Sequence, residues 1–291
     1  HCENGLWMKF EEQKFAQMIL LKLQGRKTQY KHISEAYKYL KAEYLEPRRI
    51  EFQGESIFTQ NLFPNILPCQ NNFIDMDTME LVSPDPKYYK TICLPIKFFD
   101  GENLRSFDAS FIDGVFKTLY DSKEKAEFVK RAAAYSLIQE SNFDMIFHFI
   151  GQGGTGKSTA LEWMKYTLNG GSDKDIVTSS VSLKNFDNDF YIASMLGKLA
   201  NIADENPKDI VNQIDKIKQI TSGSSVPINQ KNEKVFFASI TTKLYMGGNE
   251  SPKFGETGNQ IDRRWATITH EKMISDTEID NPMLNKLMIA D

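Results

Sequence analysis

Residues 151–159 of this 291-residue chain read GQGGTGKST, and this stretch decides the fold class. The apolar run MIFHFI at 145–150 precedes it and ALEWMKYTL at 160–168 follows it, which predicts a buried strand, a loop and a helix in that order. The pattern G-x-x-x-x-G-K-[ST] is met by Gly151, Gly156, Lys157 and Ser158. A flexible turn would also explain the glycines, but this context favours a phosphate-binding loop in an α/β domain.

The residue types of this loop each have a physical reason. Glycines let backbone N–H groups approach a phosphate closely, and a helix that begins near Gly156 points the positive end of its dipole at an anion. Lys157 is predicted to reach the β- and γ-phosphates, and the Ser158 hydroxyl to complete the shell of Mg²⁺. The predicted ligand is a nucleoside triphosphate, ATP. The residues predicted to bind it are Gly151, Gly153, Gly154, Thr155, Gly156, Lys157, Ser158 and Thr159.

The composition excludes several classes of protein. The formal net charge is −4 and the pI is about 5.7, so no overall basic field attracts nucleic acid, and any DNA contact has to come from a local cluster. The three cysteines, Cys2, Cys69 and Cys93, lack metal-type spacing, which fits a reducing, cytoplasmic compartment. No apolar run approaches the ~20 residues of a membrane span, and no signal peptide is recognisable at the N-terminus.

The chain is expected to contain two domains. Residues 1–140 are predicted to form a smaller, mixed and mainly helical N-terminal domain, and 141–291 the nucleotide-binding domain. The segment SNFD at 141–144 marks the expected boundary. Because the chain starts with His1 and stops without a terminating element, we expect a piece of a longer protein, truncated at its C-terminus.

Within the N-terminal part, the hydrophobic pattern changes twice. Residues 1–50 are predicted to be helical, from apolar positions spaced three to four residues apart over 7–45. The prolines between 50 and 100 predict short strands and turns. A helix is expected again over 122–140, with Asp121 as its N-cap.

A second predicted strand ends in two carboxylates. The stretch KLANIADE at 198–205 leads through apolar residues into Asp204 and Glu205. Asp204 is predicted to hold Mg²⁺ through water, and Glu205 to polarise the water that attacks the phosphate. An acidic helix start before Pro207 is the alternative, and the phosphate loop upstream favours the catalytic interpretation.

A third predicted strand ends in an amide. In VFFASITTKLYMGGNES, 235–251, the apolar part ends just before Asn249. An amide at the end of a strand near the phosphates can hydrogen-bond the γ-phosphate or the attacking water. A plain Gly-Gly-Asn turn is the alternative.

Two adjacent arginines follow a glycine-containing loop. In FGETGNQIDRRWATI, 254–268, RRWATI predicts the entry to another strand, on which Arg263 and Arg264 cannot face the same way. One can reach a phosphate, in the manner of an arginine finger from a neighbouring subunit, and the other a carboxylate. Surface salt bridges are the alternative for both.

A cationic hairpin is predicted between the acidic pair and Asn249. VPINQ and EKVFF read as two short strands around Lys231-Asn232, with Lys231 and Lys234 at or near the tip. Such a hairpin suits contact with a phosphodiester backbone. An exposed lysine-rich turn is the alternative.

With these motifs in place, the chain resembles the superfamily 3 helicases, and more narrowly the poxvirus-, phage- and plasmid-type primase-helicases that replicate mobile elements. The resemblance is strong over about 140–270 and weaker over 60–140. After RRWATI the chain departs from the family's apolar-Pro-Phe ending, because ITHEKM follows. The stretches that carry the resemblance are GQGGTGKST, ADE at 203–205, the segment from Lys218 through Gly223 to Lys231, NESPKF at 249–254 and IDRRW at 261–265.

The resemblance implies an AAA+-type ATPase core with a parallel central sheet. It also implies a homo-oligomer, a hexameric ring that binds ATP and Mg²⁺ between its subunits. Such rings move on single-stranded DNA, typically 3′ to 5′. The resemblance implies Asn249 as the polar sensor, Arg264 as the finger with Arg263 second, and Lys231 as the hairpin lysine that contacts DNA. Expected partners are single-stranded or forked DNA, a primase domain or other replication proteins, and no membrane.

Two other functions remain open from the sequence. One is a replication initiator whose ATPase switches assembly without processive unwinding. The other is a small-molecule kinase, which predicts a lid and an acceptor site that the sequence does not reveal. The leading expectation is an ATP-dependent DNA helicase.

Overall fold

The structure is a computed structural model. It describes residues 2–7, 16–17, 30–40, 51–52, 55–56, 63–88, 90–98, 110–141, 143–172, 174–204, 210–211, 213–231, 235–254 and 259–275. The chain divides into two units: His1–Phe63 with Pro84–Thr91, and Pro64–Ser83 with Ile92–Asp291. Each unit is described by itself.

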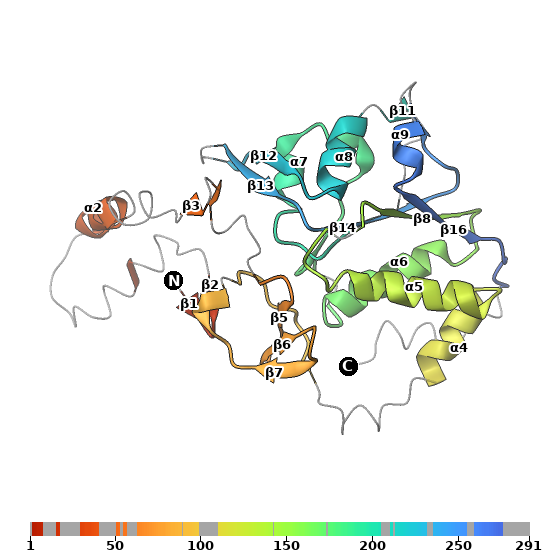
Figure 1. Cartoon of the computed structure of the whole chain (residues 1–291), viewed down its shortest axis with the longest axis horizontal. Coiled ribbons are helices and arrows are strands. Elements are labelled where there is room, and N and C mark those ends of the chain that lie inside the picture. The colour runs from red at the N-terminus through yellow and green to blue at the C-terminus, as the bar shows by residue number, and fades with distance from the viewer. Residues whose placement is uncertain are drawn as a thin grey trace. The chain divides into compact units, whose positions relative to one another are not determined.

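The smaller unit has little regular structure among its described residues (Figure 1). Its helix α2 (Tyr30–Leu40) falls inside the helical segment expected from the sequence and buries Ile33. Trp7, expected in a helix, instead lies in a strand. The other elements are the hairpins β1 (Cys2–Glu3) with β2 (Leu6–Trp7) and β3 (Glu51–Phe52) with β4 (Glu55–Ser56), and the turn η2 (Pro86–Tyr88).

The larger unit is built on a five-stranded sheet with the order β16-β8-β14-β10-β9 (Figure 1). All four strand pairs are parallel, which confirms the parallel central sheet expected from the sequence. The strand β8, which leads into the glycine loop, therefore has β14 on one side and β16 on the other. The strands are β8 (Ile146–Gly151), β9 (Thr178–Ser179), β10 (Ala200–Ala203), β14 (Lys243–Gly248) and β16 (Trp265–His270).

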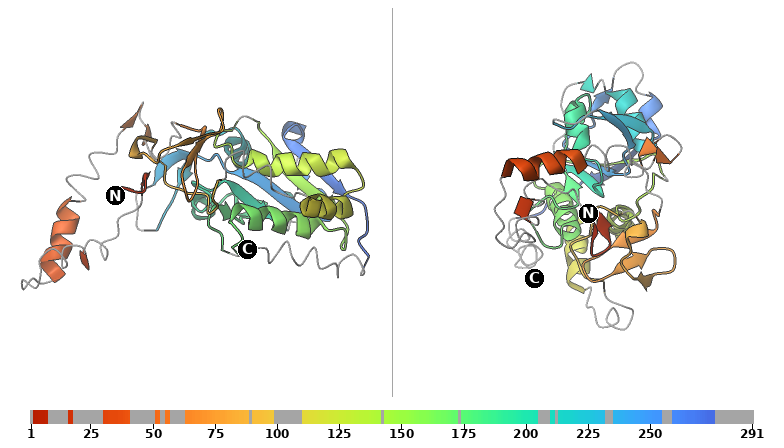
Figure 2. Two further views of the ribbon diagram at one scale, coloured as in Figure 1. Left: turned by 90° about the horizontal axis from the view of Figure 1, so that it is seen from below. Right: turned by 90° about the vertical axis from the view of Figure 1, so that its left-hand side faces the viewer.

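One face of the sheet packs against three helices. Alternate strand residues such as Phe147, Phe149 and Tyr245 point to this face and share a core with the helices. Figure 2 shows α5 and α6 side by side along the strands. These helices are α4 (Ser110–Leu119), α5 (Lys123–Tyr135) and α6 (Lys157–Leu168). The expected domain boundary near residue 141 therefore lies inside the larger unit, because α4 and α5 cover the sheet.

The other face carries the alternate residues, among them Ile146, Leu244 and Met246, in a second core. This core contains the short helices and the hairpin β12–β13, which forms where the sequence predicts a hairpin. Its elements are η3 (Leu183–Asn185), α7 (Asp189–Ala193), α8 (Ile214–Thr221), β12 (Ser225–Ile228) and β13 (Phe236–Ser239). Nearby lie the two-stranded pair β11 (Ile210–Val211) with β15 (Lys253–Phe254), and α9 (Asn259–Asp262).

The residues upstream of α4 add a small antiparallel meander to the larger unit. Its order is β5-β6-β7, and Leu67 and Ile74 join the core beneath α4 and α5. These are short strands of the kind expected between residues 50 and 100. They are β5 (Ile66–Pro68), β6 (Phe73–Asp75) and β7 (Glu80–Val82).

The structure also tests the predicted N-cap of the helix α5 and the expected absence of a membrane-spanning helix. The N-cap of α5 is Ser122, whose hydroxyl accepts a hydrogen bond from the Lys125 N–H at 3.0 Å, so the prediction of Asp121 is wrong by one residue. Asp121 instead pairs with the Lys125 ammonium at 3.0 Å. Within the described part of the chain, no helix has the length and apolar character needed to cross a membrane.

Candidate functional site

The glycine loop, residues 151–159, joins β8 to α6. Two of its glycines have a positive φ, +81° at Gly154 and +75° at Gly156, where side chains are disfavoured. Gly156 is also the N-cap of α6, and a Cβ there would collide with Ile274 and Leu119. The loop conformation therefore depends on glycine for both backbone geometry and space.

The apex of the loop is open while its base is packed. Gly153 and Gly154 are exposed, and a Cβ built on Gly153 would meet no atom within 4 Å. Thr155 is buried, and its hydroxyl donates to the Gln152 carbonyl at 2.8 Å. The loop thus presents exposed backbone at Gly153 and Gly154 near the start of a 12-residue helix, an arrangement suited to an anion.

Lys157 and Asn249 meet although they lie far apart in the sequence. Lys157 is 8% exposed, and its ammonium donates to Oδ1 of Asn249 at 3.4 Å. This contact forms because β14 lies beside β8 in parallel, so both strands end at the same edge of the sheet. The amide expected to lie near the phosphates therefore does lie next to the lysine of the glycine loop.

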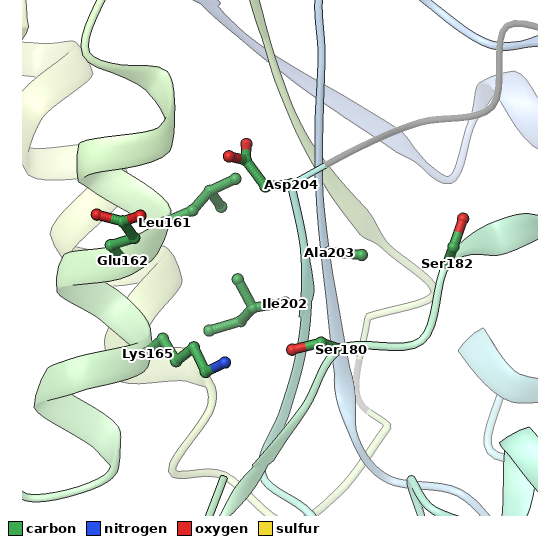
Figure 3. A pocket seen from close by; sticks show the side chains of 8 residues that line it. All are labelled: Leu161, Glu162, Lys165, Ser180, Ser182, Ile202, Ala203 and Asp204. Carbon is green, nitrogen blue, oxygen red and sulfur yellow. The ribbon is translucent and has the colours of Figure 1, made fainter. Parts of the chain in front are cut away.

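Asp204 reaches the same edge from the end of β10. Its carboxylate packs over the backbone of β14, where a Cβ on Gly247 would lie 2.5 Å from Asp204 Oδ1. Asp204 also lines a pocket of about 380 Å³ between α6 and β10. Figure 3 shows its carboxylate at one end of this pocket, with Glu162 and Lys165 of α6 on the flank and Ser180 and Ser182 opposite. Asp204 is exposed at this end of the pocket.

A buried histidine lies beneath the glycine loop. His270 pairs with Gly151 in the sheet register, and its Nδ1 lies 3.3 Å from the carbonyl of Thr155. A carbonyl only accepts, so Nδ1 carries the proton and Nε2 can accept from the Tyr120 hydroxyl at 3.5 Å. Burial lowers the pKa of His270 to about 4, which keeps the ring neutral at neutral pH.

The two adjacent arginines occupy opposite environments in the turn before β16. Arg264 is 6% exposed, and its guanidinium pairs with the Asp144 carboxylate at 2.6 Å and the Thr221 hydroxyl at 3.0 Å. Arg263 is exposed. One arginine therefore does bind a carboxylate, but it is Arg264, the residue that the family resemblance had favoured as the finger.

The remaining predicted residues are partly visible. Ser158 and Thr159 lie half-buried in the first turn of α6, and Lys231 is exposed in the turn after β12. Glu205 and Lys234 lie outside the described residues.

The sequence did not predict four residues around the loop. An isolated tyrosine and a strand histidine carry no spacing signal, so Tyr120 and His270 were missed. Leu119 and Ile274, which pack against Gly156, were missed as well.

Comparison with known proteins gives one family match. Residues 149–264 match the model described as "Family of unknown function (DUF5906)". This span begins in β8 and ends at Arg264, so it contains the glycine loop, Asp204, the hairpin and Asn249. No curated protein matches the chain.

Three solved structures are similar to the chain. "The A form apo structure of NrS-1 C terminal region-CTR" is 16% identical with a TM-score of 0.49, covering 79% of this chain and 52% of that chain. "The A form apo structure of NrS-1 C terminal region-CTR(305-718)" is 16% identical with a TM-score of 0.45, covering 62% and 42%. "The apo structure of NrS-1 C terminal region (305-718)" is 19% identical with a TM-score of 0.46, covering 62% and 44%. This chain thus spans about half the length of those chains.

Proposed function

We propose that the chain is an ATP-dependent motor that acts on DNA, a helicase of replication whose active site is shared between copies. The observation that carries this proposal is the convergence of Lys157, Asn249 and Asp204 at the edge of the sheet where the glycine loop lies. Asp204 follows β10, Asn249 follows the neighbouring strand β14, and Lys157 begins α6 after the loop that follows β8. A lysine, an amide and an exposed carboxylate around an open glycine loop suit phosphoryl chemistry.

The residues present fit a bound MgATP. The open space at Gly153 and the exposed loop backbone suit the phosphates, and Lys157 would neutralise them. Ser158 and Asp204 would hold Mg²⁺, which would supply positive charge to neutralise the phosphates. Asn249 would orient the attacking water or the γ-phosphate. Glu205 stays our candidate for activating that water.

The position of Arg263 supports a site completed by a second copy. Arg263 precedes β16, whose first residue pairs with Ile146 at the start of β8, whereas the glycine loop follows the end of β8. β8 has six residues, so the two sites are separated by roughly 20 Å at about 3.3 Å per residue. Arg263 therefore does not reach the loop of its own chain but is free to serve a neighbour, and it replaces Arg264 as our preferred finger.

The hairpin supplies a mechanical link to the nucleotide. β13 ends at Ser239, β14 begins at Lys243, and Asn249 follows the end of β14. A displacement of the cationic hairpin tip at Lys231 would therefore act on the strand that carries the γ-phosphate sensor. In this proposal hydrolysis and DNA movement are coupled through β14.

The test is ATPase activity across a protein concentration series, with and without single-stranded DNA, followed by strand displacement on a forked substrate. We expect activity per chain to rise steeply with concentration, to increase with single-stranded DNA and to require Lys157, since Lys157→Ala removes the phosphate contact. Stimulation without strand displacement would instead identify an ATP-switched initiator. Full activity of a monomer that ignores DNA would contradict the proposal.

A further inference from the structure

The hairpin β12–β13 has two chemically different faces. Its inner face buries Val226, Ile228 and Ala238 against the second core, which includes α7 and α8. Its outer face carries Phe237, which is 61% exposed, and Val235, which is 54% exposed. These two residues are two positions apart on one strand, so the pleat directs them to the same side.

Packing against the described residues of the larger unit leaves the phenyl ring of Phe237 largely uncovered on this outer face. The residue opposite Phe237 in the register is Pro227, which is itself only half-buried. Among the described hairpin residues, 224–231 and 235–240, the only charged side chain is that of Lys231 at the exposed tip. The described residues of the outer face therefore present a flat aromatic ring with a small apolar surround, and Lys231 adds an exposed cation in the turn that follows β12.

This combination fits one kind of occupant better than others. A purely apolar partner surface would not need the lysine, and a polyanion without flat apolar groups would not need the ring. Single-stranded nucleic acid offers both, because each nucleotide carries a phosphate and an unstacked base with a π face. Duplex DNA keeps its bases stacked on one another, so its base faces are not accessible to a phenyl ring.

We propose that Phe237 is a stacking platform for a base of single-stranded DNA, next to the cationic tip of the hairpin. The inference rests on the proposed function only in that the hairpin faces DNA. It adds a contact to the base, whereas Lys231 contacts the backbone. Such stacking tolerates any sequence, as a translocating protein requires.

The experiment measures affinity by fluorescence anisotropy for two labelled strands of equal length, oligo(dT) and a fully abasic strand, at fixed salt. Phe237→Ala should weaken binding to oligo(dT) about tenfold, since stacking contributes about 1–3 kcal/mol per base. It should leave binding to the abasic strand nearly unchanged. Phe237→Trp should keep the affinity for oligo(dT), and thermal unfolding of each variant confirms that it folds.

Two control variants make the readout specific. Phe190→Ala removes another exposed phenyl ring, 56% exposed on α7 and away from the outer face, and should change neither affinity. Lys231→Ala should weaken binding to both strands and reduce the salt dependence, because it removes a phosphate contact.

The outcomes separate the two proposals. If Phe237→Ala matches the wild type on oligo(dT), or loses affinity equally on the abasic strand, the stacking inference is wrong while a loss in Lys231→Ala still supports the DNA-binding hairpin. If Phe237→Ala instead reduces self-association in sedimentation, the face is an interface between copies and the inference is wrong. If the wild type binds neither strand, the proposed function itself fails.

Discussion

Arg263 and Arg264 are adjacent in the sequence, but one side chain is exposed and the other is buried. Arg264 turns inward and connects Asp144, two residues before the start of β8, to Thr221 at the end of α8. Arg263 turns outward. The buried guanidinium holds its own fold together, and the exposed one is available to another molecule.

Substituting each arginine should therefore give a different defect. Arg264→Ala breaks the ion pair between the buried Arg264 and the half-exposed Asp144. It should lower the free energy of unfolding by about 2 kcal/mol, less than the loss of a fully buried pair. Arg263→Ala should leave stability unchanged and abolish ATP hydrolysis. Urea unfolding and ATPase assays on both variants check this.

Mixing variants tests whether the arginine acts on a neighbouring copy. Neither Lys157→Ala nor Arg263→Ala should hydrolyse ATP alone. A mixture should regain activity, because a Lys157→Ala copy can lend its intact arginine to the intact loop of an Arg263→Ala copy. A mixture of Lys157→Ala with Arg264→Ala is the control, because Arg264→Ala lowers stability but keeps Arg263. No recovery on mixing would argue against a shared site.

His270 predicts an acid-sensitive fold. Burial lowers its pKa from 6.5 to about 4, and burial has the same effect on His148 in β8. Between pH 6.5 and pH 4, the two histidines bind protons in the unfolded chain but not in the folded chain. The contribution of the neutral histidines to the free energy of unfolding is therefore complete above pH 6.5 and is lost as the pH falls toward 4. Unfolding free energies measured from pH 7 to 4 should decline, and His270→Gln, which keeps a donor for Thr155, should flatten the decline. An unchanged slope would show that His270 does not titrate as described.

At the scale of elements, the glycine loop and the first turn of α6 form one unit with the segment that follows β16. The Ile274 N–H donates to the Gly154 carbonyl at 2.9 Å, and Ile274 also limits the space at Gly156. The loop conformation is thus supported by two contacts, His270 with the Thr155 carbonyl and Ile274 with the Gly154 carbonyl. Its geometry depends on β16 as much as on its own glycines.

Two alanine substitutions in this loop should differ sharply. Gly156→Ala forces a left-handed residue and a clash with Leu119 and Ile274, so it should destabilise by at least about 1 kcal/mol and lower Tm by roughly 2–4 °C or more. Gly153→Ala meets nothing within 4 Å and should leave Tm unchanged. Thermal unfolding of the two variants side by side measures the difference. Equal Tm values would mean that the Gly156 conformation is not required for stability.

At the scale of the molecule, both faces of the sheet carry apolar side chains, so a stable fold requires other elements to bury each face. The face formed by Phe147, Phe149 and Tyr245 is covered by α4, α5 and α6, and two of these helices precede residue 141. The edge of the sheet that carries the glycine loop therefore depends on residues outside the segment that carries the motifs.

Truncation tests this dependence. A piece comprising residues 64–291 should unfold cooperatively and bind ATP, because it keeps α4, α5 and the meander β5–β7. A piece comprising residues 141–291 should fail to unfold cooperatively, since it exposes the apolar face of β8 and β14. Circular dichroism melts and nucleotide binding by both pieces give the answer. Cooperative folding of the shorter piece would support a domain boundary near residue 141.

Local patterns determined much of this protein. The glycine loop, the acid strand, the cationic hairpin and the strand after the arginines are readable because each is a short run whose residue types are required by its own backbone and burial. The parallel sheet follows from strands that alternate with helices. The contact between Lys157 and Asn249 could be anticipated because parallel strands end at a common edge.

Only the tertiary structure decided what each side chain faces. Arg263 and Arg264 are chemically identical, and the positions of Asp144 and Thr221 determined which one is buried. His270 and Tyr120 became supports of the loop through contacts between residues 150 positions apart. The helices α4 and α5 joined the sheet because its apolar face had to be covered. Such pairings are set by packing in three dimensions, and no local pattern encodes them.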